Sequence, residues 1–132
     1  MTLDEVANGF ERVVRAYNAA QEGKKIGRRV FICSPYGADP VKGAEIATRL
    51  CRKALDEGQY PFAPHLLYPR FLDEHSRNDR ETGIRAGLAY IESCNEIWVY
   101  AVDGISAGMQ REIEHASQRG IPVRFVTLKE AE

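Results

Sequence analysis

The 132-residue sequence predicts an α/β protein with one open, mostly parallel sheet of about four to five strands, in a Rossmann-like or flavodoxin-like arrangement. Three observations predict this fold. Short apolar runs alternate along the chain with longer segments in which apolar residues recur at helical spacing. The run VFIC at residues 30–33 has no polar break, as in a strand buried on both faces of a parallel sheet. The regular alternation of strand and helix signals places helices on both faces.

The chain opens with a separate helical segment. Thr2-Leu3-Asp4-Glu5 has the form of a capping box, and residues 2–20 are predicted to be helical. The stretch QEGKKIGRRV that follows is basic and contains glycine, which is typical of a solvated connector. We therefore predict an N-terminal helix with a basic linker over residues 1–26 and an α/β domain over residues 27–132. The helix carries an apolar stripe made of Leu3, Val6, Phe10, Val13, Val14 and Tyr17.

The first half of the domain contains one strand, one helix and a second strand. RRVFICS, residues 28–34, is the first strand. Asp39 is the predicted N-cap of a helix that has Pro40 at its first position and extends to Gly58. A second strand is expected within YPFAPHLL, residues 60–67. The core stripe of the helix is predicted to be Ala47, Leu50, Cys51, Ala54 and Leu55.

The second half begins with a long polar excursion, YPRFLDEHSRNDRETG, which leads into a helix over residues 80–94. EIWVYAV, residues 96–102, is the third strand, in which Trp98 is expected to pack in the core. A loop over residues 103–107 and a helix over residues 109–119 follow, and PVRFVTL is the fourth strand. The inner stripe of the first of these helices is predicted to be Ile84, Leu88, Ile91 and Cys94.

Composition excludes several classes of function. A net charge of −1 and an isoelectric point near 6.3 predict neither nucleic acid nor a membrane surface as a partner. No cluster of His, Cys and Asp has metal-ligand spacing, so we expect no metal and no cofactor. The N-terminus lacks the features of a signal peptide, which favours a cytoplasmic protein. Cys33, Cys51 and Cys94 are expected to be buried reduced thiols, with a reactive Cys33 as the alternative.

Ligands of open parallel sheets bind beyond the carboxyl ends of the strands. Three loops are expected at that edge: residues 34–39 after the first strand, 64–66 after the second and 103–108 after the third. Two of these loops contain glycine and lead into helix N-termini, where backbone N–H groups bind anions. No loop has the G-x-G-x-x-G or Walker pattern, so a monophosphate or a ribose-sized group is favoured over a dinucleotide.

The segments FICSPYGAD, APHLLYPRFL and EIWVYAVDGISAGMQREIEHA resemble the nucleoside 2-deoxyribosyltransferase-like superfamily, which includes the 2'-deoxynucleoside 5'-phosphate N-hydrolases, and within it an uncharacterised bacterial and phage branch. The resemblance covers residues 29–127. Ser106-x-Gly108-x-x-x-Glu112 resembles the serine, glycine and nucleophilic glutamate of that superfamily. The resemblance implies hydrolysis or deoxyribosyl transfer at the N-glycosidic bond of a nucleoside or nucleotide, through a covalent glutamate intermediate.

The resemblance also implies roles for individual residues. Glu112, placed in the first turn of its helix and therefore ionised at neutral pH, is the nucleophile. Gly108 allows the sugar to approach the backbone, and Ser106 donates to a phosphate or sugar oxygen. Tyr36 covers the sugar or base. The other residues of the expected substrate site are Ser34, Pro35, Gly37 and Asp103.

One position departs from the pattern of the superfamily. Gly87 falls where the superfamily has an aspartate that orients and protonates the base. His65 is the candidate replacement acid, because the ordinary pKa of histidine lies near neutrality. Asp79 and Glu81 would replace the aspartate only if the helix were shifted. Without an acid, the loss of a poor leaving group is slow.

Simpler interpretations stay open. Glu112 is also explained as a charge that complements a helix dipole, and His65 and Tyr36 as structural residues. The glycine at position 87 favours a second function, a catalytically inactive protein that senses or sequesters a nucleotide-derived ligand. A third is an interaction protein that assembles through its N-terminal helix. The apolar stripe of that helix is not needed for the sheet core and is expected to pack against a twin subunit in this third case. Sites of the superfamily are often completed by a neighbouring subunit, so the resemblance implies a homo-oligomer in each case.

Overall fold

A computed structural model describes residues 1–21 and 27–129 of the chain. Within these residues the sheet has four strands, all parallel, in the order β2-β1-β3-β4. The strands are β1 (Arg29–Cys33), β2 (Tyr60–Phe62), β3 (Glu96–Val99) and β4 (Val123–Phe125). The predicted α/β class is confirmed, with the central strands β1 and β3 paired in register from Val30 opposite Glu96 to Cys33 opposite Val99.

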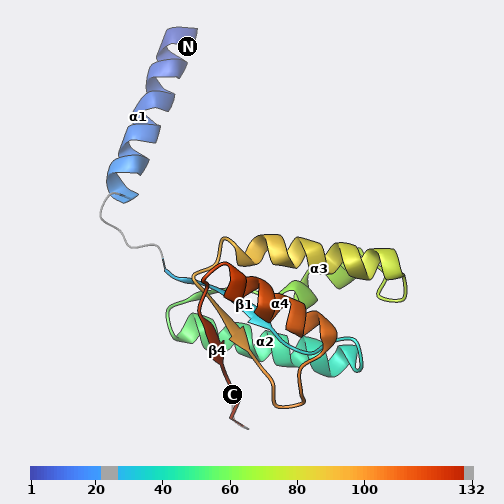
Figure 1. Cartoon of the computed structure of the whole chain (residues 1–132). Helices are drawn as coiled ribbons and strands as arrows, with labels where there is room; N and C mark the ends of the chain where they lie inside the picture. Colours follow the sequence, from blue (N-terminus) through green and yellow to red (C-terminus); the bar gives the residue numbers. More distant parts are fainter. Residues whose placement is uncertain (22–26, 130–132) are drawn as a thin grey trace.

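Helices cover both faces of the sheet, as the alternation of elements predicted. The helix α2 (Pro40–Asp56) lies on one face, and α3 (Arg77–Ile91) and α4 (Ala107–Gln118) lie together on the other (Figure 1). Two short 3-10 helices, η1 (Pro64–Leu66) and η2 (Tyr68–Arg70), connect β2 to α3. The N-terminal helix α1 (Leu3–Gln21) stands apart from the sheet in the same view.

Strand residues alternate between two apolar cores. Val30, Ile32 and Trp98 face α2 and pack against Leu50 and Ala54. Their sequence neighbours on β1 and β3 face the opposite side of the sheet, as the two-residue period of a strand requires. There they pack against α3 and α4, in a cluster of Phe31, Cys33, Ile91, Ile97, Val99, Met109 and Ala116. The sheet is therefore buried on both faces, and the core position expected for Trp98 is confirmed.

Several element boundaries differ from the predicted ones. The second strand ends at Phe62 because Pro64 begins a 3-10 helix. The helix α3 begins at Arg77, three residues before the predicted start, because the Ser76 hydroxyl caps it by accepting from the Asp79 N–H. Leu55 was expected in the core stripe of α2, but it lies in the last turn of that helix, which ends at Asp56, and it is 51% exposed.

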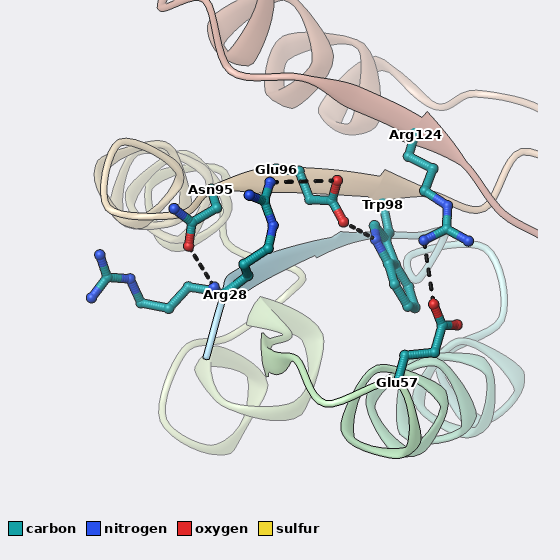
Figure 2. Close-up of polar contacts among 7 residues, drawn as sticks. Arg28, Glu57, Asn95, Glu96, Trp98 and Arg124 are labelled. Carbon is teal, nitrogen blue, oxygen red and sulfur yellow. Dashed lines mark hydrogen bonds and ion pairs between the residues drawn. The ribbon is translucent and has the colours of Figure 1, made fainter. Parts of the chain in front are cut away.

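A network of polar contacts fixes the amino ends of β1 and β3, opposite the edge expected to bind ligand (Figure 2). The Asn95 side chain accepts from the Arg29 N–H at 2.7 Å, and the Glu96 carboxylate accepts from the Trp98 indole N–H at 2.8 Å. The Arg124 guanidinium lies 5.0 Å from the centre of the Trp98 ring and 3.4 Å from a Glu57 carboxylate oxygen. The Glu96 contact satisfies the indole N–H, which is the one polar side-chain atom of the fully buried Trp98.

The apolar stripe predicted on the first helix is exposed. The Leu3, Phe10 and Tyr17 side chains on α1 are 89%, 70% and 64% exposed, and those of Val6 and Val13 are also open to solvent. The capping contact is present at the start of α1, where the Thr2 hydroxyl accepts from the Glu5 N–H at 3.1 Å. Over the described residues, no helix combines the length and the apolar content that crossing a membrane requires.

Candidate active site

A pocket of about 520 Å³ lies at the carboxyl ends of the strands. The strands β1 and β3 are neighbours in the sheet, but the chain leaves β1 through α2 on one face and reaches β3 through α3 on the other. Such a point, where connections diverge to opposite faces, is where open α/β sheets bind ligands. The pocket is lined by the loop after β1, residues 35–38, the loop into α4, residues 103–108, and parts of η1, η2 and α3.

The helix α4 positions its residues differently from the predicted arrangement. It begins at Ala107 because Ser106 is its N-cap, whose hydroxyl accepts from the Met109 N–H at 3.2 Å. Glu112 therefore lies in the second turn of the helix, and the first turn holds no acidic residue. The expected placement of Glu112 in the first turn is wrong. The helix dipole acts on the terminal turn, so it provides little stabilisation of the charge on this carboxylate.

Glu112 nevertheless lines the pocket from its inner wall. Its side chain is only 5% exposed and lies between β1 and α3. Burial raises the pKa of Glu112 from its ordinary value of 4.5 to about 8, and a hydrogen bond with the Cys33 thiol partly opposes this rise. The expectation that Glu112 is ionised at neutral pH is therefore wrong for the unliganded protein. The protonated form predominates below pH 8 because desolvation disfavours the charge.

Cys33 lies beneath the same carboxyl group. Its side chain is fully buried at the end of β1, with its sulfur 3.7 Å from the Met109 carbonyl oxygen. Burial, and secondly the neighbouring Glu112, raise the pKa of the Cys33 thiol far above its usual range. A thiol that stays protonated is a poor nucleophile, which argues against the reactive Cys33 and supports the buried structural thiol.

Gly87 faces Glu112 from α3. A Cβ atom built at Gly87 would lie 3.8 Å from Glu112 Oε2 and 3.6 Å from Phe31 Cζ, at ordinary contact distances. The position where the resemblance implied an aspartate is thus adjacent to the candidate nucleophile, but it carries no side chain. The helix α3 therefore provides no acid at this point.

The loops after β1 and β2 are joined by a stacked pair of rings. The Tyr36 and His65 rings have centroids 4.9 Å apart and an interplanar angle of 14°. His65 Nε2 lies 2.7 Å from the Ser34 carbonyl oxygen, so this nitrogen carries the hydrogen and donates it. Burial lowers the pKa of His65, although the Ser34 hydrogen bond partly opposes this effect. A neutral ring whose N–H is already engaged is unsuited to the acid role expected for His65.

The remaining predicted residues divide into two groups. Pro35, Gly37, Asp103 and Gly108 line the pocket together with Tyr36, Ser106 and Glu112. Ser34 does not, because its side chain is fully buried and its hydroxyl has no hydrogen-bond partner among the described residues. Ser34 contributes to the site only through its carbonyl oxygen. Asp103 is held at the rim by an ion pair with Lys42, at 3.4 Å.

Sequence reasoning missed Tyr68 and Glu74, which the polar excursion brings to the pocket, and it gave Asp79 a site role only if its helix were shifted. Tyr68, Glu74 and Arg80 line the pocket, and so does Asp79, whose carboxylate accepts from the Asp73 N–H at 2.8 Å. The early start of α3 brings Asp79 and Arg80 there. Glu81 instead forms an ion pair with Arg111 at 2.7 Å. The available signal was Ser76, a helix-capping residue type three positions before Asp79.

Among the described residues, no group of three or more His, Cys, Asp or Glu side chains is arranged to hold a metal ion. The polar groups of the pocket combine one inner carboxyl group, a helix N-cap hydroxyl and a ring pair. This set of groups is suited to binding a sugar ring beside a planar base.

Comparison with known proteins places the chain in a family. Residues 28–126 match the family described as Domain of unknown function (DUF7768), and the chain belongs to this family. No curated protein matches the chain. Among solved structures, it is similar to a 2-deoxyribosyltransferase from the psychrotolerant bacterium Bacillus psychrosaccharolyticus, with a TM-score of 0.56 and 16% sequence identity. The alignment covers 74% of this chain and 70% of that chain, and it shows a common fold.

Proposed function

We propose that this protein cleaves the N-glycosidic bond of a nucleoside-like or nucleotide-like ligand, or transfers its deoxyribosyl group, with Glu112 as the nucleophile. The observation that carries the proposal is the position of Glu112, a buried carboxyl group on the inner wall of the pocket at the divergence point of the sheet. The fold shared with a 2-deoxyribosyltransferase supports it, as does the Ser106-x-Gly108-x-x-x-Glu112 pattern.

The proposed reaction has two steps. An ionised Glu112 oxygen attacks the anomeric carbon, the bond from that carbon to the base nitrogen breaks, and the base leaves with the electron pair and takes up a proton. Water, or a second base, then attacks the same carbon and releases the Glu112 carboxylate. Two displacements at one carbon give overall retention of configuration, through oxocarbenium-like transition states.

The other residues of the site bind and orient in this proposal. The Ser106 hydroxyl accepts from the Met109 N–H and keeps its own hydrogen to donate to a ligand oxygen. The Tyr36 ring, backed by His65, offers a flat surface to the sugar or base. Gly37 and Gly108 let the ligand approach the backbone, while Asp103 and Pro35 form part of the rim. We propose His65 as a positioning residue that acts through Tyr36.

The central test is an assay of base release. The protein is incubated with deoxynucleosides, deoxynucleoside 5'-monophosphates and ribonucleotides, and the free base is measured by chromatography. We expect release with at least one deoxy substrate and a loss of at least about 100-fold in Glu112→Gln, because the amide is not a nucleophile. Glu114→Gln is the matched control, since that side chain is exposed on the same helix and accepts from Gln110. Equal activity of Glu112→Gln and the wild type would contradict the proposal.

The raised pKa predicts an unusual pH dependence for this activity. Attack requires ionised Glu112, and with a pKa of about 8 only about a tenth of the unliganded protein carries that charge at pH 7. We therefore expect kcat/KM to rise about tenfold from pH 7 to pH 9. The measurement is the initial rate at low substrate concentration over this range. A rate that is flat between pH 6 and pH 9 would show that Glu112 is not the group that must ionise.

The glycine at position 87 predicts a dependence on the leaving group. No acid lies beside Glu112 on α3, and the His65 N–H is engaged by Ser34. A base that needs no protonation, such as 7-methylguanine, should then leave at least about 100-fold faster than guanine, since a general acid is worth about that much or more. The two deoxynucleosides are compared at saturation. Similar rates would reveal an acid elsewhere in the pocket.

The same observations favour a second candidate function, a binding protein without chemistry. A Glu112 that stays protonated at neutral pH donates a hydrogen bond to a sugar oxygen instead of attacking carbon. In that case nucleoside-derived ligands raise the melting temperature of the protein but release no base. The assay series distinguishes the two functions, because only the enzyme produces free base that Glu112→Gln abolishes.

A further inference from the structure

The apolar stripe of α1 follows a seven-residue repeat. Leu3, Phe10 and Tyr17 are spaced by seven, and Val6 and Val13, also spaced by seven, lie three positions after Leu3 and Phe10. This is the a and d pattern of a helix that packs along its length against another helix. Charged side chains are confined to the other face of the helix, at Asp4, Glu5, Glu11, Arg12 and Arg15.

The helix has no packing partner for this stripe within the described part of the chain. The five repeat residues have side chains between 50% and 89% exposed, and Figure 1 shows α1 apart from the sheet. Three valines and the interior Gly9 each lower the intrinsic helix propensity of α1 relative to alanine. Most helices owe their stability to burial of an amphipathic face, so a helix of this composition requires a surface that covers its stripe.

We propose that this surface is the α1 helix of a second copy of the chain, packed antiparallel to the first. In one register each large side chain faces a smaller one: Phe10 lies opposite Val13 of the partner subunit, and Tyr17 lies opposite Val6 of the partner subunit. The two-fold axis then passes between Phe10 and Val13, and each contact occurs twice. This is an isologous interface, in which one patch is complementary to itself.

The helix dipoles favour the antiparallel direction, because the positive end of each helix lies beside the negative end of the other. The charged side chains do not decide the direction. They lie on the face away from the stripe, and in the register above Asp4 and Glu5 face positions 19 and 18 of the partner subunit.

The residues that flank the repeat point to a second copy as the occupant. Ala7, Gly9, Val14 and Ala16 occupy these positions, and none carries a charge that would select a different partner. The small residues also allow close approach of the two backbones. A membrane surface is disfavoured, because the polar face of the described α1 residues has three acidic and two basic side chains and is not rich in lysine and arginine.

The test is the mass of the full-length protein in solution. Light scattering after size exclusion should give twice the 14.8 kDa of one chain, and Phe10→Glu should halve that mass. Asn8→Glu, which adds the same charge to the polar face of α1, should leave the mass unchanged. Circular dichroism and the melting temperature establish that each variant has kept the folded α/β domain. A wild type with the mass of one chain, or Phe10→Glu with the mass of two, would overturn the proposal.

Mixing two variants tests the direction of the pair. Phe10→Glu and Val13→Lys should each have the mass of one chain when alone. An equimolar mixture should regain the mass of two, because the antiparallel register places position 10 opposite position 13 of the partner subunit. A parallel pair would place position 10 opposite position 10, so a mixture that stays at the mass of one chain overturns the antiparallel register. Neither measurement depends on catalysis, so failure here leaves the proposed function untouched.

Discussion

Burial changes the pKa of the Glu112 carboxyl group more than its position in the helix does. A glutamate near a helix N-terminus is usually stabilised as an anion, which was the basis for expecting an ionised nucleophile. The structure places Glu112 one turn further along and buries it beside Cys33 and Gly87, and the pKa rises to about 8. Desolvation outweighs the dipole because the helix field falls off within the first turn, whereas burial acts wherever water is excluded.

This carboxyl group predicts how stability depends on pH. The folded protein holds the Glu112 proton more tightly than the unfolded chain does, so its contribution is fully present below pH 4.5 and is lost as the pH rises through about 8. We expect Glu112→Gln to be more stable than the wild type at pH 8, by on the order of 3 kcal/mol, and less different at pH 6.5. Denaturant unfolding at both values measures the difference.

The comparison between pH 6.5 and pH 8 isolates Glu112 from the other shifted groups. Burial lowers the pKa of His65, so its contribution is lost as the pH falls below 6.5. Cys33 titrates in the unfolded chain near pH 9, above the window. Glu114→Gln, on the same helix but exposed, should behave as the wild type. A stability difference between Glu112→Gln and the wild type that does not change with pH would contradict the raised pKa.

At the scale of elements, the close packing of α2 on the loop after β1 shapes one wall of the pocket. A Cβ atom at Gly43 would lie 2.7 Å from the Pro35 carbonyl oxygen and 2.8 Å from the Tyr36 Cα, and both are backbone atoms. Only glycine permits this approach, which holds Tyr36 in place beside His65. The first turn of α2 is thus built around the loop that carries the ring pair.

Gly43→Ala is therefore predicted to destabilise the protein by about 1–3 kcal/mol and to displace the loop that carries Tyr36. The added methyl group would collide with backbone atoms, which cannot move aside as easily as the end of a flexible side chain. Thermal unfolding measures the first effect, and the affinity for a bound nucleoside the second. Gly37→Ala is the control for the melting temperature only, since nothing lies within 4 Å of a Cβ atom there, its φ is not positive, and the residue itself lines the pocket. Equal melting temperatures for Gly43→Ala and the wild type would show that the loop relaxes freely.

The order and type of the elements could be predicted from the sequence because burial imposes strong patterns. Strand residues such as Phe31 and Trp98 occur in uninterrupted apolar runs, and Pro40 and Gly120 mark helix ends. The boundaries of the helices were harder to predict than their order. The starts of α3 and α4 are set by capping hydrogen bonds to the hydroxyls of Ser76 and Ser106, and such local bonds decide between neighbouring positions. The helix α4 begins at Ala107, two residues before its predicted start, and this difference places Glu112 in the second turn.

Prediction of the site was limited by long-range packing. The loops at the carboxyl edge could be located from the order of the elements, and Tyr36, Ser106 and Gly108 line the pocket. Tyr68 and Glu74 could not be assigned to it, because the path of a long polar segment depends on contacts distant in sequence. The burial that changes the pKa of Glu112 and His65 also arises from several elements together.

At the scale of the whole molecule, we propose that α1 and the α/β unit fold independently of each other. The family match begins at residue 28, and the stripe of α1 is exposed in the described residues. We predict that a chain of residues 27–132 folds with the melting temperature and ligand response of the full protein but has the mass of one chain. Calorimetry and light scattering test this. A truncated chain that fails to fold would show that α1 packs on the sheet and would contradict the proposed domain boundary.

Trp98 also makes the folded sheet directly observable. It is the single tryptophan of the sequence, it is fully buried at the centre of the sheet, and the Arg124 guanidinium lies over its ring while Glu96 accepts its N–H. An indole shielded from water emits at shorter wavelength than a hydrated one. The intrinsic fluorescence of this protein therefore reports on one site where β3, β4 and α2 meet, and a red shift in its emission marks the separation of these layers without any added label.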